Sequence, residues 1–173
     1  GIGTGAPEQK EWEGLIKKEG SRIKIAKGGQ RIILEEGNIS VFFDVLYPFE
    51  SLENQNFENS NDTSIVCRLT IGRNSVLFTG DIGKQIEEKL LKYGIDSDVL
   101  KVPHHGSKTA NFEGFLEKVS PEIAVISVGK NNYGHPSEEL LMILERFGIK
   151  TLLTKEQGDI TKIRDGNKIY ERN

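Results

Sequence analysis

Asp98-Val-Leu-Lys-Val-Pro-His-His-Gly-Ser107 is the stretch that decides the fold of this 173-residue chain. Val99–Val102 is mostly apolar and predicts a short buried strand, which ends at Pro103 because proline cannot continue a ladder of backbone hydrogen bonds. Two adjacent histidines, His104 and His105, follow at once. A buried strand with histidines at its end is typical of a ligand or catalytic site in a layered α/β fold.

The same arrangement occurs before and after this stretch. A predicted strand over Ser75–Thr79 ends in Gly80-Asp81, and a strand over Ile123–Val128 leads to Tyr133-Gly-His-Pro-Ser137. All three histidines and a strand-end aspartate therefore follow strands of one alternating α/β series. Because such strand ends gather side chains at one edge of a sheet, the combined pattern favours a metal or phosphate site.

Periodic patterns divide the rest of the chain. Helices are expected from Pro7, with Trp12, Leu15 and Ile16 on one face, and over Ile82–Tyr93, Phe112–Val119 and Ser137–Phe147. Further strands are expected over Arg22–Ala26, Arg31–Glu35, Ile39–Leu46, Thr63–Ile71 and Thr151–Thr154, with a final hairpin over Asp159–Tyr170 turning at Asp165-Gly-Asn167. The early strands indicate an antiparallel meander, and the asparagine-rich stretch Pro48–Asp62 indicates a long exposed loop.

Size and composition fit a single domain over residues 1–173, with a flexible start over residues 1–6. The net charge of −3 gives no overall basic surface for nucleic acid, although a metal ion would supply positive charge locally. Cys67 is the only cysteine, which excludes an internal disulfide and a cysteine-rich zinc site. No stretch of the sequence predicts a membrane span or a signal peptide, and the compartment is left open.

Asp81 ends a strand that is expected to be buried, where an unpaired carboxylate is costly. A divalent metal ion would neutralise it, and one aspartate bridges two metals through its two oxygens. Alternatively, Asp81 caps the helix that starts near Ile82.

His104 and His105 are neighbours and point in different directions, so one is suited to ligate a metal while the other orients or protonates a substrate. Gly106 permits close approach of the backbone, and Ser107 with Lys108 is suited to hold a phosphate oxygen. Alternatively, the histidines are exposed loop residues, and Ser107 or a neighbouring hydroxyl caps the next helix.

His135 lies just before Pro136 and Ser137, which start a helix. The positive end of that helix favours a nearby anion and keeps an imidazole neutral. A neutral imidazole ligates a metal or donates a hydrogen bond to phosphate. Alternatively, this segment is simply a rigid start for the helix.

These motifs, in this order, closely resemble the metallo-β-lactamase-fold domain of ComEC-type DNA-internalisation (competence) proteins. The resemblance extends from about Arg22 onward and rests on Ser75–Asp81, Asp98–Ser107 and Ser127–Ser137. It implies an αββα sandwich with a dinuclear metal site at one edge of the two sheets. Zinc or manganese is expected there, activating water against a phosphodiester such as DNA.

The resemblance also implies roles for individual residues. Asp81 corresponds to the bridging carboxylate, and the next active-site motif is the His104-His105 pair, with His104 slightly favoured as the ligand. His135 corresponds to a late active-site histidine that ligates metal or contacts phosphate, and Asn61 lies where many relatives of the wider fold place another histidine ligand. The implied metal ligands are drawn from Asp81, His104, His105 and His135, and the implied catalytic residues are His105, His135 and Ser107.

One part of the family's pattern is absent. Its principal metal motif, His-x-His/Asp-x-Asp-His, and an earlier Asp-x-Gly strand do not occur, since no histidine precedes His104. The family places both upstream, so we expect the chain to be the C-terminal half of such a domain and a poor hydrolase alone. Half a sandwich would expose a sheet face and an edge, which predicts self-association, such as a homodimer.

Three functions are consistent with these patterns. The chain is part of a metal-dependent nuclease or phosphodiesterase for DNA uptake, whose parent is membrane-anchored with this domain outside the cytoplasm. A second interpretation is a stand-alone hydrolase of the same fold that acts on another phosphodiester or ester. A third is a non-enzymatic α/β module whose histidines bind a metal or anion structurally.

Overall fold

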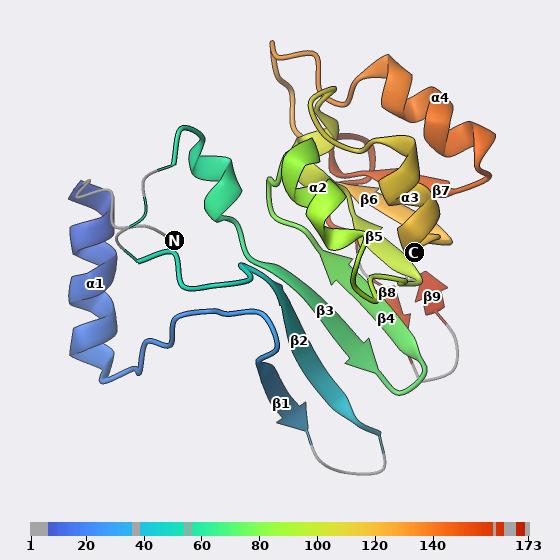
Figure 1. Cartoon of the computed structure of the whole chain (residues 1–173). Helices are drawn as coiled ribbons and strands as arrows, with labels where there is room; N and C mark the ends of the chain where they lie inside the picture. The colour runs from blue at the N-terminus through green and yellow to red at the C-terminus, as the bar shows by residue number, and fades with distance from the viewer. Residues whose placement is uncertain are drawn as a thin grey trace.

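The centre of the molecule is a seven-stranded mixed sheet in which every strand neighbours the next one along the chain, in the order β1-β2-β3-β4-β5-β6-β7 (Figure 1). This computed structural model describes residues 7–35, 39–53, 55, 57–160, 162–164 and 169–171. The strands are β1 (Arg31–Glu35), β2 (Val41–Tyr47), β3 (Val66–Ile71), β4 (Asn74–Phe78), β5 (Val99–Lys101), β6 (Ile123–Ile126) and β7 (Lys150–Leu153). The helices are α1 (Pro7–Glu19), α2 (Lys84–Leu90), α3 (Glu113–Val119), α4 (Glu138–Arg146) and α5 (Thr154–Gln157), with 3-10 turns η1 (Ser60–Thr63) and η2 (Pro103–Gly106).

The sheet changes character at β4. Strands β1 to β4 pair antiparallel. Short connections join β1 to β2 and β3 to β4, whereas the longer segment 48–65, which contains η1, joins β2 to β3. From β4 to β7 the pairing is parallel, and α2, α3 and α4 form the connections between successive strands. The predicted α/β class is therefore confirmed, as is the hairpin of β3 with β4. Of the predicted meander of three strands, the pair β1 and β2 is present.

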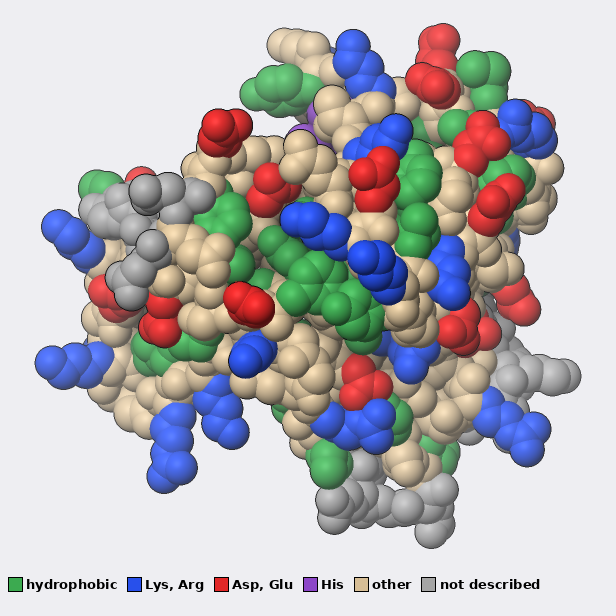
Figure 2. All heavy atoms as spheres, viewed as in Figure 1, with side chains coloured by type: hydrophobic (Ala, Val, Ile, Leu, Met, Phe, Trp, Pro, Cys, Tyr) green, Lys and Arg blue, Asp and Glu red, His purple; other side chains and the backbone are tan. Residues whose placement is uncertain are grey.

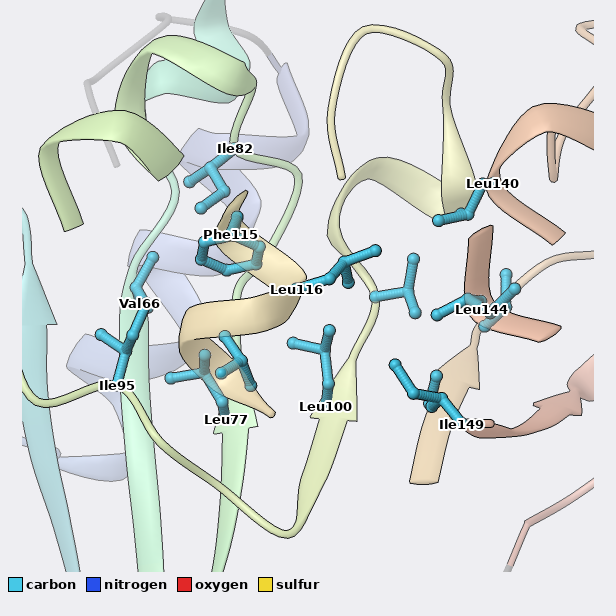
Figure 3. Close-up of a cluster of buried hydrophobic side chains, with 14 of the residues drawn as sticks. Val66, Leu77, Ile82, Ile95, Leu100, Phe115, Leu116, Leu140, Leu144 and Ile149 are labelled. Carbon is cyan, nitrogen blue, oxygen red and sulfur yellow. The ribbon is translucent and has the colours of Figure 1, made fainter. Parts of the chain in front are cut away.

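The parallel half explains why one face of the sheet is covered. From β4 to β7, each new strand lies on the same side of the one before it. Right-handed connections between such strands place every crossover helix on the same face of the sheet. Figure 1 shows α2, α3 and α4 together over that face. The core between these helices and the sheet is drawn in Figure 3 and includes Val66, Leu77, Ile82, Ile95, Leu100, Phe115, Leu116, Leu140, Leu144 and Ile149.

The opposite face of the sheet, called here the open sheet face, is also apolar. One row across it consists of residues paired strand to strand, namely Ile32, Phe43, Leu69, Val76, Val99 and Ile123. Towards β7 this face is buried, in a small cluster that Ile160 helps to cover. Towards β1 it is accessible, since Ile32 is 52% exposed and Phe78, in the next row, is 37% exposed. Burial of such a surface would be favourable.

The strand predicted over Arg22–Ala26 is wrong. That segment forms no strand, and the turn after it bonds elsewhere: the Gly28 amide donates to the Pro48 carbonyl at 2.7 Å, and the Gly29 amide to the Val45 carbonyl at 2.9 Å. These hydrogen bonds hold the turn against the end of β2. Residues 22–26 therefore do not pair with β1 as a neighbouring strand.

The two ends of the described chain lie outside the main core. Helix α1 begins at Pro7 as predicted, but none of its residues is buried, and Trp12 and Leu15 are 55% and 53% exposed. Strands β8 (Lys162–Arg164) and β9 (Ile169–Glu171) form the predicted hairpin. Its expected turn over residues 165–167 and the expected flexible start over residues 1–6 fall outside the described residues. Within the described part of the chain, no helix combines the length and apolarity that crossing a membrane requires.

Candidate active site

The predicted site residues meet at the carboxyl ends of the parallel strands. Asp81 follows β4, His104 and His105 lie in η2 after β5, and His135 follows β6. The ring centroids of His104 and His135 are 5.8 Å apart, and those of His104 and His105 are 6.4 Å apart. From the side drawn in Figure 2, only a small area of histidine is visible, in a hollow at the upper edge. The convergence expected from the three strand ends is therefore present.

His105 is held in one orientation by its backbone surroundings. Its Nδ1 lies 2.6 Å from the Ser127 carbonyl oxygen, and its Nε2 lies 3.5 Å from Asp81 Oδ2. A carbonyl oxygen only accepts, so Nδ1 carries the proton. In the neutral imidazole, the Nε2 lone pair then faces a carboxylate oxygen. Two acceptors face to face require a cation, either a proton on Nε2 or a metal ion bound by both groups.

Lys101 is a site residue that sequence reasoning missed. Its Nζ donates to the Gly80 carbonyl at 2.7 Å and lies 3.3 Å from Asp81 Oδ1, on the side of the carboxylate away from His105. Burial lowers the pKa of Lys101, and the charge of Asp81 opposes that shift. The available signal was a lysine within the otherwise apolar strand Val99–Val102, where only a partnered ammonium is tolerated.

Gly106 lets the two histidine motifs pack closely. Its φ is +79°, and a Cβ at this position would lie 2.7 Å from Pro136 Cβ and 3.1 Å from Leu140 Cδ2. The Ser137 amide also donates to the Gly106 carbonyl at 2.9 Å. The close approach that the sequence predicted at Gly106 is thus an approach to the other histidine motif, and it fixes their spacing.

Gly80 lets the loop that carries Asn61 pack closely against the end of β4. With φ at +57°, a Cβ on Gly80 would lie 2.7 Å from Ser64 Cβ, and Ser64 Oγ accepts a bond from the Asp81 amide at 3.0 Å. These contacts bring η1 to the site, where Asn61 Nδ2 lies 3.3 Å from His104 Nε2. Asn61 therefore lies against His104, and its correspondence to a ligand position of the wider fold stays what the resemblance implies.

The backbone of both adjacent histidines is strained. His104 and His105 have φ values of 47° and 55°, in the left-handed region that non-glycine residues rarely adopt. Each such residue costs about 1–3 kcal/mol and persists only where its surroundings hold it. The His104 carbonyl is held by the Ser107 amide at 2.9 Å, and its own amide donates to the Gly80 carbonyl at 3.3 Å. Strain of this kind is concentrated at functional sites.

His135 has the neutral character predicted for it, although for a different main reason. Its pKa is lowered first by burial and then by the nearby imidazoles of His104 and His105. The cap of the following helix is Ser137, whose hydroxyl accepts from the Leu140 amide at 3.3 Å. The segment therefore also starts α4, as the alternative interpretation expected, and this role is compatible with a functional imidazole at His135.

Comparison with known proteins now identifies the family. A sequence model of the metallo-beta-lactamase superfamily matches residues 6–130, more than half of the chain. The chain belongs to the metallo-β-lactamase superfamily. Members of this superfamily generally bind divalent metal ions. A solved structure from Parabacteroides distasonis, described as a candidate metal-dependent hydrolase, shares the fold with a TM-score of 0.51 and 19% identity, over 82% of this chain and 61% of that one.

The relatives of this metallo-β-lactamase-fold chain include proteins named for the ComE operon, for competence and for recombination. It is 35% identical to ComE operon protein 3 of Bacillus subtilis over 83% of its length, and 41% identical to competence protein ComA of Neisseria gonorrhoeae over 68%. Recombination protein 2 of Haemophilus influenzae is 36% identical over 57% of the chain. The resemblance to ComEC-type domains is therefore confirmed. The chain spans only 18%, 17% and 13% of these three relatives, so their whole activities extend beyond it.

The alternatives that the motifs left open are decided in part by the geometry. Asp81 does not cap α2, because Gly83 occupies the cap position and no side chain bonds there. Helix α3 likewise starts without a side-chain cap. Ser107 is buried, and its hydroxyl lies 3.0 Å from that of Thr109. The catalytic role of Ser107 stays a prediction, with the hydroxyl turned to Thr109.

The residues of this metallo-β-lactamase-fold site fit part of a metal centre. Asp81 and His105 are aimed at one another as two ligands of one ion would be, whereas His104 Nε2 is turned to Asn61. No group of three or more His, Cys, Asp or Glu side chains suited to hold an ion occurs among the described residues. Of the two adjacent histidines, His105 has its Nε2 against the Asp81 carboxylate, whereas His104 has its Nε2 against Asn61.

Proposed function

We propose that this chain is the part of a metal-dependent phosphodiesterase or nuclease domain that supplies Asp81 and His105 as ligands of a divalent ion, zinc or manganese. The observation that carries the proposal is the fixed tautomer of His105, whose Nε2 faces the Asp81 carboxylate at 3.5 Å. When bound, such an ion polarises a phosphoryl oxygen and lowers the pKa of a coordinated water. Membership of the superfamily supports the assignment.

The other residues then bind and orient the substrate. His135 stays neutral at physiological pH because its pKa is lowered, so its ring is available to donate to a phosphate oxygen without carrying a charge itself. His104 packs between His105 and His135, and Asn61 holds its Nε2 side. Lys101 orients Asp81 and offsets its negative charge. All of these side chains lie at the carboxyl ends of the parallel strands.

The substrate we propose is DNA, and the setting is DNA uptake. The support is the names of three relatives: ComE operon protein 3, competence protein ComA and recombination protein 2. Because the chain covers less than a fifth of each relative, membrane anchoring and placement outside the cytoplasm are proposed for the parent protein and not for this part.

The test is metal-dependent hydrolysis of single-stranded DNA by the complete protein. Asp81→Asn and His105→Gln should each lower kcat at least about 100-fold, because each removes a ligand. Asp96→Asn is the matched control, since its side chain is 82% exposed and touches only Arg68 among the ion pairs of the described residues. Unchanged activity of both site variants would show that the histidines serve a structural role.

We also propose that the 173-residue chain is a poor hydrolase alone. The described residues offer one carboxylate and one imidazole to a shared ion, whereas catalytic zinc sites usually have three protein ligands. Purified chain with zinc or manganese should therefore show little turnover of a phosphodiester. Robust metal-dependent turnover by the chain alone would contradict this.

The open sheet face leads to a proposal on association. Its accessible part near β1 and β2 is apolar, and β1 is an edge strand. A dimer of the isolated chain that covers this face would remove the apolar surface from water. Light scattering should give a mass that rises with concentration, and Phe78→Ser should reduce that rise more than Tyr93→Ser, which removes a similarly exposed ring elsewhere. A monomer at every concentration would refute the proposal.

A further inference from the structure

We propose that the loop between β6 and α4, together with α5, forms a subsite for one strand of nucleic acid, in which a base stacks on Tyr133 and phosphates contact Lys130 and Lys155. The loop rises at the top of the molecule in Figure 1, in orange. It carries His135, whose ring lies 5.8 Å from that of His104 between centroids. This inference rests on the proposed function, because it names how the substrate of that same site is held.

Asn131 gives the loop a defined shape. Its Oδ1 accepts from the Tyr133 amide at 3.0 Å and from the His135 amide at 3.1 Å, and its Nδ2 donates to the His135 carbonyl at 2.8 Å and the Gly129 carbonyl at 3.0 Å. Four bonds from one side chain hold Tyr133 and His135 in a fixed relation. A binding surface built on a preformed loop loses less conformational entropy when it binds.

Tyr133 is an aromatic ring displayed to solvent next to the site. It is 84% exposed, although large aromatic side chains usually bury most of their surface. One side of the ring is stacked on His135, with centroids 6.0 Å apart and planes inclined by 25°. The ring is thereby positioned, and its high exposure leaves it accessible to a planar ligand. Exposed aromatic rings on which bases stack are the general means of binding single strands.

Positive charge lies beside this ring. A hollow of about 470 Å³ is lined by Gly129, Lys130, Asn131, His135, Lys155 and Glu156. Lys130 and Lys155 come from different strand exits, β6 and β7, and Glu156 is the one carboxylate in the lining. The lining thus carries a net positive charge although the chain as a whole carries −3. A local excess of lysine suits a phosphodiester backbone that approaches the neighbouring Asp81–His105 pair.

The combination of the ring with the lysines favours a single strand over a duplex. A base stacked within a duplex has no free face for Tyr133, whereas the bases of a single strand do. Lysines alone would bind either form through phosphates. The subsite would therefore place a single strand across the hollow, with one base on Tyr133 and the next phosphates directed to the histidines.

The test is fluorescence anisotropy with a labelled oligothymidylate, the purified chain and EDTA, so that neither metal nor catalysis is involved. Tyr133→Ala should weaken binding at least about fivefold, whereas Tyr133→Phe should keep it, because the ring face remains. Lys130→Ala with Lys155→Ala should weaken binding and reduce the slope of log K against log salt by about 1.4. The matched lysine control is Lys92→Ala with Lys118→Ala, at the amino ends of the parallel strands and thus at the opposite sheet edge.

An oligomer of abasic deoxyribose phosphate distinguishes stacking from charge. It should bind the unchanged chain about as weakly as oligothymidylate binds Tyr133→Ala. The inference is overturned if Tyr133→Ala binds oligothymidylate as tightly as the unchanged chain does. It is also overturned if the unchanged chain binds duplex and abasic DNA as tightly as oligothymidylate, or if it binds no DNA at low salt. The proposed function fails separately, when Asp81→Asn and His105→Gln leave hydrolysis by the complete protein unchanged.

Discussion

Gly106→Ala should damage the chain more than an ordinary glycine substitution in the same conformation. The alanine Cβ would lie 2.7 Å from Pro136 Cβ and 3.1 Å from Leu140 Cδ2, so the two histidine motifs would have to separate. The left-handed φ of +79° costs a non-glycine residue about 1–3 kcal/mol, and overpacking adds about 1–3 kcal/mol. We therefore expect the free energy of unfolding to fall by about 2–6 kcal/mol, measured by urea denaturation.

Gly134→Ala is the matched control. Gly134 has a φ of +75°, close to that of Gly106, but a Cβ there meets nothing within 4 Å. The free energy of unfolding of this variant should fall only by the conformational cost of about 1–3 kcal/mol. Equal losses for the two variants would refute the reasoning, because contact with Pro136 would then contribute nothing. The histidine signals in NMR provide a second readout: those of His104 and His135 should shift in Gly106→Ala and keep their positions in Gly134→Ala.

Two further predictions concern ionisable groups that are buried or half-buried. Burial raises the pKa of Glu87 to about 7, from 4.5, against the opposing hydrogen bonds from the Asn111 and Phe112 amides. The unfolded carboxyl ionises first as pH rises, so between pH 4.5 and 7 the free energy of unfolding should fall by about 3 kcal/mol more than in Glu87→Gln; parallel pH profiles from chemical denaturation would refute this. In EDTA, Lys101→Met should lower the free energy of unfolding by about 1–3 kcal/mol. A double-mutant cycle with Asp81→Asn should show a coupling energy of at least about 0.5 kcal/mol, and additive losses would contradict an interaction between Lys101 and Asp81.

The convergence of the site residues was predictable because of a rule about parallel strands. Once the strands before Asp81, His104 and His135 are recognised in the sequence, their parallel pairing places all three exits at one edge. The apolar periodicity of α2, α3 and α4 was sufficient to predict those helices within a few residues. Local patterns succeed here because these strands and helices are short and continuous, and glycine or proline follows most of them within a few residues.

Other features depend on contacts that no local pattern encodes. Arg22–Ala26 has the composition of a strand, but the bonds of the following turn to β2 decide its path. The preference for His104 as the ligand stays a prediction, whereas the tautomer of His105 depends on the Ser127 carbonyl, 22 residues away, which no local pattern encodes. Lys101 became visible as a site residue only through its contacts with Gly80 and Asp81. The single-domain organisation stays a prediction.

The central claim is that Asp81 and His105 share one divalent metal ion. The most direct measurement is a crystal structure of the chain grown with zinc, with anomalous data collected at the zinc edge. We predict a zinc ion in contact with the Asp81 carboxylate and His105 Nε2, while His105 Nδ1 still donates to the Ser127 carbonyl. A zinc ion held by His104 and His135 without Asp81, or a His105 ring turned away from Ser127, would contradict the claim.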